Sequence, residues 1–204
     1  MQLTVTTFLS VDGVYQGPGG PNEDRSDGFD RGGWLVSHFD EATGQFMNGL
    51  FDQVDAFLLG RRTYDIFAAS WPNTTDPYDP IASRLNTLPK YVASTTLKHP
   101  EWANSIVLEG DLASAVRELK GREGRELQVH GSGRLVQFLL DNDLVDRLNL
   151  LVFPVIVGAG RRLFPDGGIA TGLVLDESRT TGSGVAISVY RTNGRPAFGE
   201  VEAS

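Results

Sequence analysis

Three short polar segments of the chain carry residue types that can hold phosphate groups. Each follows an apolar run typical of a buried strand, and the three are Gly60-Arg61-Arg62-Thr63, Ser94-Thr95 and Gly131-Ser132-Gly133-Arg134. Arginine donates paired hydrogen bonds to phosphate oxygens, and the free N–H groups at a helix start favour an anion. Glycine lets the backbone approach a ligand closely. Taken together, the three segments favour a dinucleotide ligand.

Each segment alone also has an ordinary explanation. The first fits a solvated helix start with two surface arginines, and the third fits a tight turn whose serine caps a helix. There is no Walker A motif, and the glycines do not extend to GxGxxG, because Val136 stands where the third glycine would be. The chain has no cysteine, and His38, His99 and His130 are far apart in sequence, so no metal site is expected.

The overall charge argues against a nucleic acid or an anionic membrane surface as a partner. The 204 residues carry a formal net charge of −8, and the sequence pI is about 4.8. Hydrophobic residues make up 40% and charged residues 22% of the chain, which is typical of a globular protein with one sizeable core. No apolar run approaches the roughly 18 residues of a membrane span, and the first residues lack a basic leader. We therefore expect a cytoplasmic protein whose anionic ligands need a local basic pocket.

Periodicity predicts alternating strands and helices, followed by strands alone. Strands are expected at 3–11, 54–60, 88–94, 105–109 and 125–131, and helices at 38–53, 61–71, 112–121 and 132–142. Only strand-like runs occur in 144–158, 171–180 and 184–192. Residues 12–34, crowded with Gly, Pro, Asn and Asp, predict a long loop, either a lid or a disordered segment, and 72–80 predicts a second loop. The order indicates one α/β domain over 1–204, with a mixed, mostly parallel central sheet and antiparallel C-terminal strands.

The order and spacing of these motifs resemble the dihydrofolate reductase-like superfamily. The motifs are Gly60-Arg61-Arg62-Thr63-Tyr64, the Ser-Thr pair, the Gly-Ser-Gly turn and the segment VDRLNLLVFPVIVGAGRRLF. FLSVDGVY and PVIVGAGRRLF are similar to the branch that contains the reductase domain of the riboflavin-biosynthesis deaminase-reductase, the RibD C-terminal domain. The resemblance covers roughly residues 3–190. It implies a dihydrofolate reductase-like three-layer α/β/α fold, a homodimer, and NADPH as the cofactor.

The resemblance also implies a role for each of the three segments. The residues implied on the adenosine side, where the 2′-phosphate of NADPH lies, are Gly60, Arg61, Arg62, Thr63, Ser94 and Thr95. Those implied at the pyrophosphate are Gly131, Ser132, Gly133 and Arg134. The implied activity is hydride transfer from NADPH to a C=N or C=O bond of a small pterin- or pyrimidine-like substrate. The alternative is a non-catalytic nucleotide-binding protein that keeps the reductase fold.

On the substrate side, two acids are candidates for the group that supplies a proton. By the resemblance, Asp40 is the favoured counterpart of a carboxylate on the helix before the Gly-Arg motif, and Asp12 is the acid beside the nicotinamide. Asp40 also suits a helix N-terminus, and Asp12 also suits a simple Asp-Gly turn. Phe29 and Trp34 could stack on a planar substrate or anchor the loop. Arg161 could meet a substrate phosphate or lie exposed in a turn.

Overall fold

An eight-stranded sheet forms the centre of the computed structural model, which describes residues 1–74, 76 and 78–200. The strands are β1 (Gln2–Ser10), β2 (Val54–Gly60), β3 (Lys90–Ala93), β4 (Ser105–Val107), β5 (Glu126–His130), β6 (Arg147–Phe153), β7 (Leu173–Thr180) and β8 (Ala186–Thr192). Their order across the sheet is β4-β3-β2-β5-β1-β6-β8-β7. Neighbours from β4 to β6 are parallel, and β8 is antiparallel to both β6 and β7. The predicted mixed sheet with antiparallel C-terminal strands is therefore confirmed.

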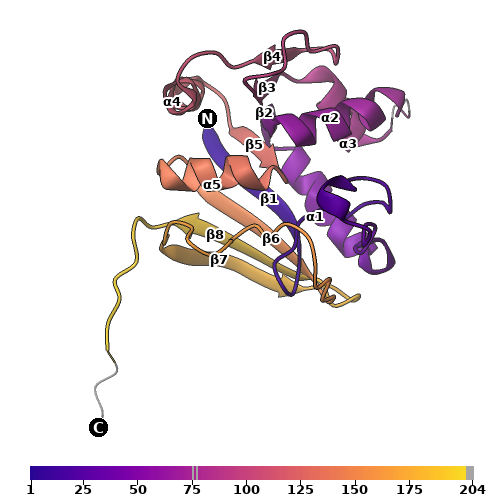
Figure 1. The fold of residues 1–204 in the computed structure, drawn as a ribbon, viewed down its shortest axis with the longest axis vertical. Helices are drawn as coiled ribbons and strands as arrows, with labels where there is room; N and C mark the ends of the chain where they lie inside the picture. The colour runs from indigo at the N-terminus through magenta and orange to yellow at the C-terminus, as the bar shows by residue number, and fades with distance from the viewer. Residues whose placement is uncertain (75, 77, 201–204) are drawn as a thin grey trace.

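Helices cover both faces of this sheet, which gives the predicted three-layer α/β/α fold (Figure 1). The helices are α1 (Glu41–Phe51), α2 (Arg61–Ser70), α3 (Pro80–Thr87), α4 (Leu112–Gly121) and α5 (Gly133–Asp141). One hydrophobic core joins α4 and α5 to the sheet through residues such as Val116 and Leu139. The other joins α1, α2 and α3 to the opposite face through residues such as Phe51 and Leu85. Within the described ranges, no helix is long and apolar enough to cross a membrane.

The parallel strands at the centre of the sheet determine where a ligand can bind. β1 lies between β5 and β6, and β5 lies between β1 and β2, so these strands are largely buried under both helical layers. The carboxyl ends of β1, β2 and β5 are Ser10, Gly60 and His130, and they lie along one edge of the sheet. Open α/β sheets bind ligands at this edge, because loops and helix starts leave a crevice there.

Two helices differ from the sequence prediction: α1 begins at a later residue, and α3 was not predicted. α1 begins at Glu41 rather than at 38, because Asp40 caps it by accepting a hydrogen bond of 2.9 Å from the Thr43 N–H. α3 lies where no helix was predicted, with Asp79 as its cap and Pro80 in its first turn. Positions 75 and 77 of the predicted 72–80 loop, and positions 201–204 of the predicted domain, lie outside the described residues.

Hydrogen bonds join the two arms of the predicted loop 12–34 to each other. The Trp34 Nε1–H donates to the Gln16 carbonyl at 2.8 Å, and the Gly33 N–H donates to the Gly17 carbonyl at 2.8 Å. Its two arms come so close that a Cβ on Gly32 would lie 2.5 Å from the Gly20 carbonyl oxygen, which only glycine avoids. The loop therefore has a defined path beside the carboxyl edge of the sheet.

Candidate functional site

One open cavity of about 1350 Å³ lies at the carboxyl edge of the sheet. Its walls come from the ends of β1 and β5, the starts of α2 and α5, and the loop from Gly17 to Asp24. The predicted site residues that line it are Gly60, Arg61, Arg62, Thr63, Gly131, Ser132, Gly133, Arg134 and Arg161. The fold therefore brings the first and third phosphate-binding segments into one cavity. Among the described residues, the lining does not include Asp12, Phe29, Trp34, Asp40, Ser94 or Thr95.

Direct hydrogen bonds join the ends of β2 and β5 within this cavity. The Ser132 hydroxyl accepts from the Gly60 N–H at 3.0 Å and donates to the Thr63 hydroxyl at 2.8 Å. The Ser132 N–H also donates to the Thr63 Oγ1, at 3.2 Å. Ser132 can make these contacts because its backbone adopts a left-handed conformation, with φ of 51°. These hydrogen bonds hold the two predicted phosphate-binding segments together.

The start of α5 needs a glycine because an aromatic ring lies against it. A Cβ added to Gly133 would lie 2.4 to 2.7 Å from three outer atoms of the Tyr15 side chain. Gly131 has φ of 56° and donates its N–H to the Thr6 carbonyl at 3.1 Å. In this conformation the Tyr15 ring covers the helix start at which an anion would bind.

The two arginines at the start of α2 point in different directions. Arg61 donates to both carboxylate oxygens of Asp65 at 2.8 Å and to the Thr96 hydroxyl at 3.1 Å. Arg62 instead donates to the Ser26 hydroxyl of the long loop, at 2.7 Å. The pair therefore divides between two sides of the cavity, and Arg61 alone reaches the segment after β3.

That segment contributes a different residue from those predicted. The Ser94 hydroxyl accepts hydrogen bonds from the N–H groups of Thr96 and Leu97, at 3.2 and 3.0 Å, and so holds a turn. Thr95 is exposed. Thr96, which contacts Arg61, is the hydroxyl of this segment that reaches the start of α2. A Ser-Thr-Thr run does not reveal which of its hydroxyls closes the turn, so sequence alone could not separate them.

Arg161 and Arg62 meet an acidic part of the long loop. The Arg161 guanidinium donates to the Ser26 hydroxyl at 2.9 Å and to Asp27 at 2.7 Å, and it also forms an ion pair with Asp24. Arg62 lies 3.9 Å from Asp24 and 3.7 Å from Asp27. Burial acts to raise the pKa of Asp24, but hydrogen bonds from Ser26 and the charges of Arg161 and Arg62 lower it below its usual value. The loop carboxylates therefore neutralise both arginines in this conformation.

Asp12 lies outside the cavity lining and holds a turn. Its carboxylate accepts from the Ser10 hydroxyl at 2.7 Å and from the N–H groups of Val157 and Gly158, at 3.0 and 2.8 Å. Burial acts to raise its pKa, but these hydrogen bonds outweigh burial and lower the pKa to about 2. An acid with this pKa is ionised at neutral pH and cannot act as a proton donor there. The predicted catalytic role of Asp12 finds no support in this geometry.

Asp40 is also used by the backbone. Besides capping α1, its carboxylate accepts from the Thr43 hydroxyl at 2.8 Å and from the Ser183 N–H at 3.0 Å. The hydrogen bonds from Thr43 and Ser183 hold the pKa of Asp40 well below its usual value. The predicted helix 38–53 would contain Asp40 in its first turn. The residue stands instead before the first turn of α1, where it joins this helix to the turn between β7 and β8.

Phe29 and Trp34 anchor the long loop to the body. Phe29 is 6% exposed and packs in a small core with Val14 and Val157. The Trp34 ring lies edge-on to Phe153, with 5.9 Å between the ring centroids. Both contacts agree with the predicted alternative in which Phe29 and Trp34 anchor the loop. Neither ring lines the cavity.

Sequence reasoning missed an apolar part of the cavity. We call it the aromatic lobe, and it is defined by Phe8, Phe39, Met47, Phe51, Ile66 and Phe67. These residues come from β1, α1, α2 and the segment before α1. In sequence they belong to apolar patterns that equally predict core packing, so no signal separates them from the core until the elements are placed.

His130 lies at the end of β5, on the cavity wall, and is 6% exposed. Its Nε2 lies 3.0 Å from the Gln128 side-chain oxygen, and its ring is 4.9 Å from that of Phe51. Because an amide oxygen only accepts hydrogen bonds, this contact assigns the proton to Nε2. Burial lowers the pKa of His130 to about 4, so the ring is neutral at pH 7. The structural role expected for a lone histidine at a strand end is compatible with these contacts.

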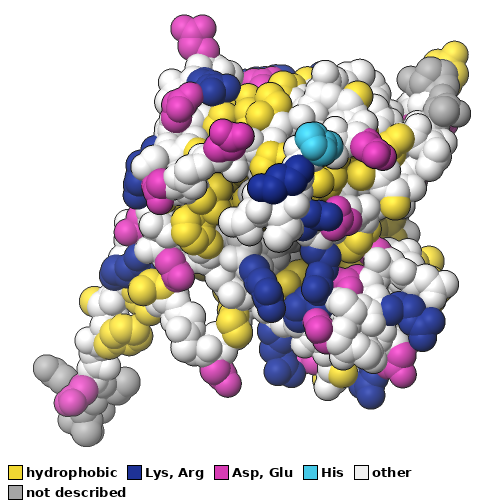
Figure 2. All heavy atoms as spheres, turned by 45° about the horizontal axis from the view of Figure 1, so that its top comes forward, with side chains coloured by type: hydrophobic (Ala, Val, Ile, Leu, Met, Phe, Trp, Pro, Cys, Tyr) yellow, Lys and Arg dark blue, Asp and Glu magenta, His cyan; other side chains and the backbone are white. Residues whose placement is uncertain are grey.

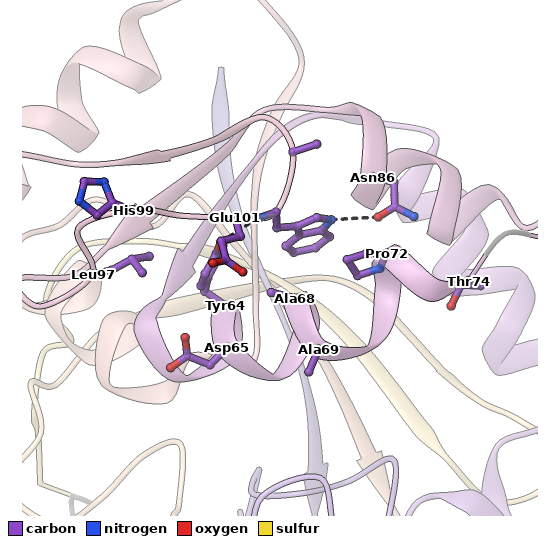
Figure 3. Close-up of a pocket in the computed structure, with 12 residues that line it drawn as sticks. Tyr64, Asp65, Ala68, Ala69, Pro72, Thr74, Asn86, Leu97, His99 and Glu101 are labelled. Atoms are coloured by element: carbon purple, nitrogen blue, oxygen red, sulfur yellow. Dashed lines mark hydrogen bonds between the residues drawn. The ribbon is translucent and has the colours of Figure 1, made fainter.

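A second, shallower groove of about 890 Å³ lies beside α2 (Figure 3). Its floor is fixed by Trp102, whose N–H donates to the Tyr64 hydroxyl at 3.2 Å and whose ring N–H donates to the Asn86 side-chain oxygen at 2.9 Å. His99 and Glu101 lie at its edge (Figure 3). In the part of the chain that the structure describes, no group of three or more acidic or histidine residues could hold a metal ion.

The charged surface is uneven despite the negative net charge of the chain. Figure 2 shows Lys and Arg side chains gathered near the centre of one face of the molecule, while acidic side chains are spread more widely. Of the cavity residues, Arg61, Arg62, Arg134 and Arg161 supply positive charge. Because Arg61, Arg62 and Arg161 are paired with Asp65 and Asp24, an anionic ligand would have to displace these carboxylates.

Comparison with known protein families shows the family to which the chain belongs. The model of the RibD C-terminal domain matches residues 1–187, so the chain belongs to the RibD C-terminal domain family. Two uncharacterized proteins of Bacillus subtilis (strain 168) are similar over most of their length. YyaP is 29% identical over 195 residues, which cover 95% of this chain and 96% of YyaP. YwjB is 28% identical over 159 residues, which cover 76% of this chain and 86% of YwjB.

Solved structures show the same fold. A protein from Shewanella sp. PV-4, assigned provisionally to riboflavin biosynthesis, superposes with a TM-score of 0.72 at 23% identity, covering 95% of this chain and 99% of the other. A pyrimidine reductase-like protein from Corynebacterium diphtheriae superposes with a TM-score of 0.61 at 16% identity, covering 94% and 92%. At these identities the likeness establishes the reductase-like fold.

Proposed function

We propose that this protein is an NADPH-dependent reductase acting on a C=N or C=O bond of a small ring compound. The observation that carries the proposal is the single cavity that joins the two glycine- and arginine-bearing helix starts to the aromatic lobe. Phosphates and a reducible ring could therefore be held in one continuous space. Membership of the RibD C-terminal domain family supports the same activity.

The residues present fit a dinucleotide. The cavity lining includes the apolar residues Ala93, Leu112 and Phe138, which suit a nucleobase, together with the arginine-bearing helix starts and the aromatic lobe. In addition, Thr7 is among the lining residues, and its buried hydroxyl has no hydrogen-bond partner within the described part of the chain. A buried hydroxyl without a partner is costly, and the amide of a nicotinamide would provide one.

We assign the following roles to the chain. Arg61 with Thr96 would hold the 2′-phosphate, and the start of α5 would hold the pyrophosphate once the Tyr15 ring moves aside. The bound cofactor would supply the hydride. Because Asp12 and Asp40 are held by the backbone away from the cavity, and His130 is neutral, water would supply the proton.

A non-catalytic nucleotide-binding protein is the second candidate. One observation favours it: Asp12 and Asp40 lie outside the cavity lining, where their carboxylates accept hydrogen bonds from backbone N–H groups. A protein of this kind would bind the cofactor without reducing any compound. Following NADPH oxidation at 340 nm in the presence of aldehydes and imines separates the two candidates.

The role of Arg61 is tested by comparing two cofactors. We expect Arg61→Ala to raise the Kd for NADPH about tenfold or more, the loss of roughly 1.4 kcal/mol or more expected for a charged hydrogen bond to phosphate. The Kd for NADH should change by less than about twofold, because NADH lacks the 2′-phosphate. The measurement is titration of the protein while cofactor fluorescence is followed.

Arg62→Ala is the matched control, since it removes the same charge from the neighbouring position. Arg62 faces Ser26 rather than Thr96, so its loss should affect NADPH and NADH to the same degree. Equal effects of Arg61→Ala on both cofactors would contradict the assignment of the 2′-phosphate. Failure of the unaltered protein to bind NADPH at micromolar concentrations would remove the proposed function itself.

A further inference from the structure

The part of the cavity wall that α2 forms changes from charged to apolar along the helix. Its first turns present Arg61, Arg62 and Asp65, whereas the later turns present Ile66 and Phe67. A helix rises about 1.5 Å per residue, so the change takes place over less than about 10 Å. The aromatic lobe is thus a distinct region beside the charged one.

We propose that the aromatic lobe selects an uncharged, planar aromatic carbonyl or imine compound that carries no phosphate group. This inference rests on the proposed function and specifies its substrate class. It differs from the expectation that Arg161 meets a substrate phosphate, because the loop carboxylates of Asp24 and Asp27 already pair with that arginine.

The geometry of the rings favours a planar aromatic compound. Phe39 is 42% exposed, which is unusual for a large aromatic side chain that lines a cavity. Its ring lies edge-on to Phe8, with centroids 6.3 Å apart and planes at 88°. Phe67 of α2 lies edge-on to Trp71, with centroids 6.2 Å apart. A flat ring in the lobe would gain offset or edge contacts with these side chains.

The charges of the cavity lie outside the lobe and most of them are paired. Arg61 is bonded to Asp65, and Arg62 and Arg161 contact the carboxylates of the long loop. Glu23 accepts hydrogen bonds from the N–H groups of Gly19 and Gly20. A phosphate carried into the lobe would lose its hydration and meet no cation among the lobe residues, which is unfavourable in an apolar site.

His130 lines the cavity beside the lobe residue Phe51, with 4.9 Å between the ring centroids. The ring is neutral at pH 7 because burial lowers its pKa to about 4. With Nε2 bonded to Gln128, the free Nδ1 can accept a hydrogen bond but cannot neutralise an anion. This favours an uncharged ligand.

The test compares one aldehyde with its own phosphate ester. The probes are 6-hydroxy-2-naphthaldehyde and the ester formed at its hydroxyl group, titrated calorimetrically into the protein with and without NADPH. We expect the free aldehyde to bind at least about tenfold more tightly than the ester, a difference of about 1.4 kcal/mol. Equal or tighter binding of the ester would overturn the inference.

Two variants locate the binding. Ile66→Asp places a charge in the lobe and should abolish aldehyde binding, while Asn73→Asp adds the same charge on an exposed residue outside the cavity lining and should leave it unchanged. If Ile66→Asp fails to fold, Phe39→Ala replaces it. Phe39 is largely exposed, so its truncation should weaken aldehyde binding several-fold while the melting temperature changes little. Unchanged affinity in Ile66→Asp or in Phe39→Ala would also overturn the inference.

An activity measurement separates this inference from the proposed function. Reduction of the aldehyde converts its C=O bond to an alcohol, with a hydride from NADPH at carbon, a proton from water at oxygen, and NADP⁺ as the second product. Aldehyde binding without any NADPH binding would leave the inference standing and remove the proposed function. NADPH binding together with preferred reduction of the ester would do the reverse.

Discussion

Asp12 and Asp40 each join segments that are far apart in sequence. Asp12 accepts from the N–H groups of Val157 and Gly158, and Asp40 accepts from the N–H of Ser183. A carboxylate can accept several hydrogen bonds, and one that follows a strand or precedes a helix meets free backbone N–H groups. Both acids stand at such positions. At the scale of residues, their first effect is therefore on stability.

We expect Asp12→Asn to lower the free energy of unfolding by about 1–3 kcal/mol at pH 7, because a partly buried set of hydrogen bonds loses its charged acceptor. The folded-state pKa of about 2 lies below the ordinary value of 3.8, so the carboxylate contributes stability above about pH 4. This contribution is lost as the pH falls towards 2. The difference between variant and parent should shrink over the same range, as measured by urea unfolding at several pH values.

Asp30→Asn is the control for this prediction. Asp30 lies in the same loop, its side chain is 75% exposed, and its contact with Arg31 is 3.9 Å long. The same change of charge there should alter stability by less than about 0.5 kcal/mol. A loss of reductase activity in Asp12→Asn without any loss of stability would instead favour the catalytic role predicted from the sequence.

At the scale of elements, the sequence was sufficient to predict the strands of the sheet and four of the helices. Alternation and periodicity identified the strands and α1, α2, α4 and α5, because each buries a regular apolar pattern. α3 was missed although Asp79-Pro80 is a helix start signal, since the Pro- and Asp-rich run before it favours a loop. The predicted start of α1 was too early, because Phe39 belongs to the same apolar pattern as the helix although it precedes the cap residue Asp40.

The candidate site could be predicted in part, for a physical reason. The glycines and arginines after β2 and β5 are chemically distinctive and lie on elements that the pattern locates. The direction of a side chain is not encoded in this way, so the divergence of Arg61 and Arg62 could not be anticipated. The aromatic lobe was hidden for the same reason, because Met47 and Phe67 look like ordinary core residues in sequence.

The coupling between the long loop and α5 can be tested with Gly133 and Tyr15. In Gly133→Ala the new Cβ would overlap the outer atoms of the Tyr15 ring, and we expect a loss of about 1–3 kcal/mol in unfolding free energy. In a Tyr15→Ala background the same substitution should cost much less. A double-mutant cycle by chemical denaturation measures this coupling, and additive effects would show that the ring can move aside freely.

At the scale of the whole molecule, β7 is an edge strand whose eight residues are all exposed. Leu173, Val174 and Leu175 are 40%, 38% and 53% exposed. An apolar strand at a sheet edge is a template for association with another chain. We propose that two copies of the protein pair through this strand, in line with the homodimer expected from the sequence.

Leu175→Glu should shift the protein from dimer to monomer, because it places a charge in the apolar stretch of β7. Light scattering coupled to size-exclusion chromatography measures the mass directly. Val36→Glu is the control, since Val36 is 58% exposed and lies outside β7. A monomeric parent protein, or a dimer that survives Leu175→Glu, would contradict this interface.

The position of β1 has a consequence for how the chain is made. β1 is synthesised first, yet its register partners lie far along the chain, with Gln2 opposite Glu126 and Ser10 opposite Phe153. By contrast, β2, β3 and β4 can pair as soon as residues 54–107 have left the ribosome. The nascent chain must therefore carry β1 with both edges free until β5 emerges and with one edge free until β6 emerges, and such parallel, long-range pairing is slow. The centre of the sheet is expected to close late, which makes the incomplete chain the form most exposed to aggregation and to chaperones.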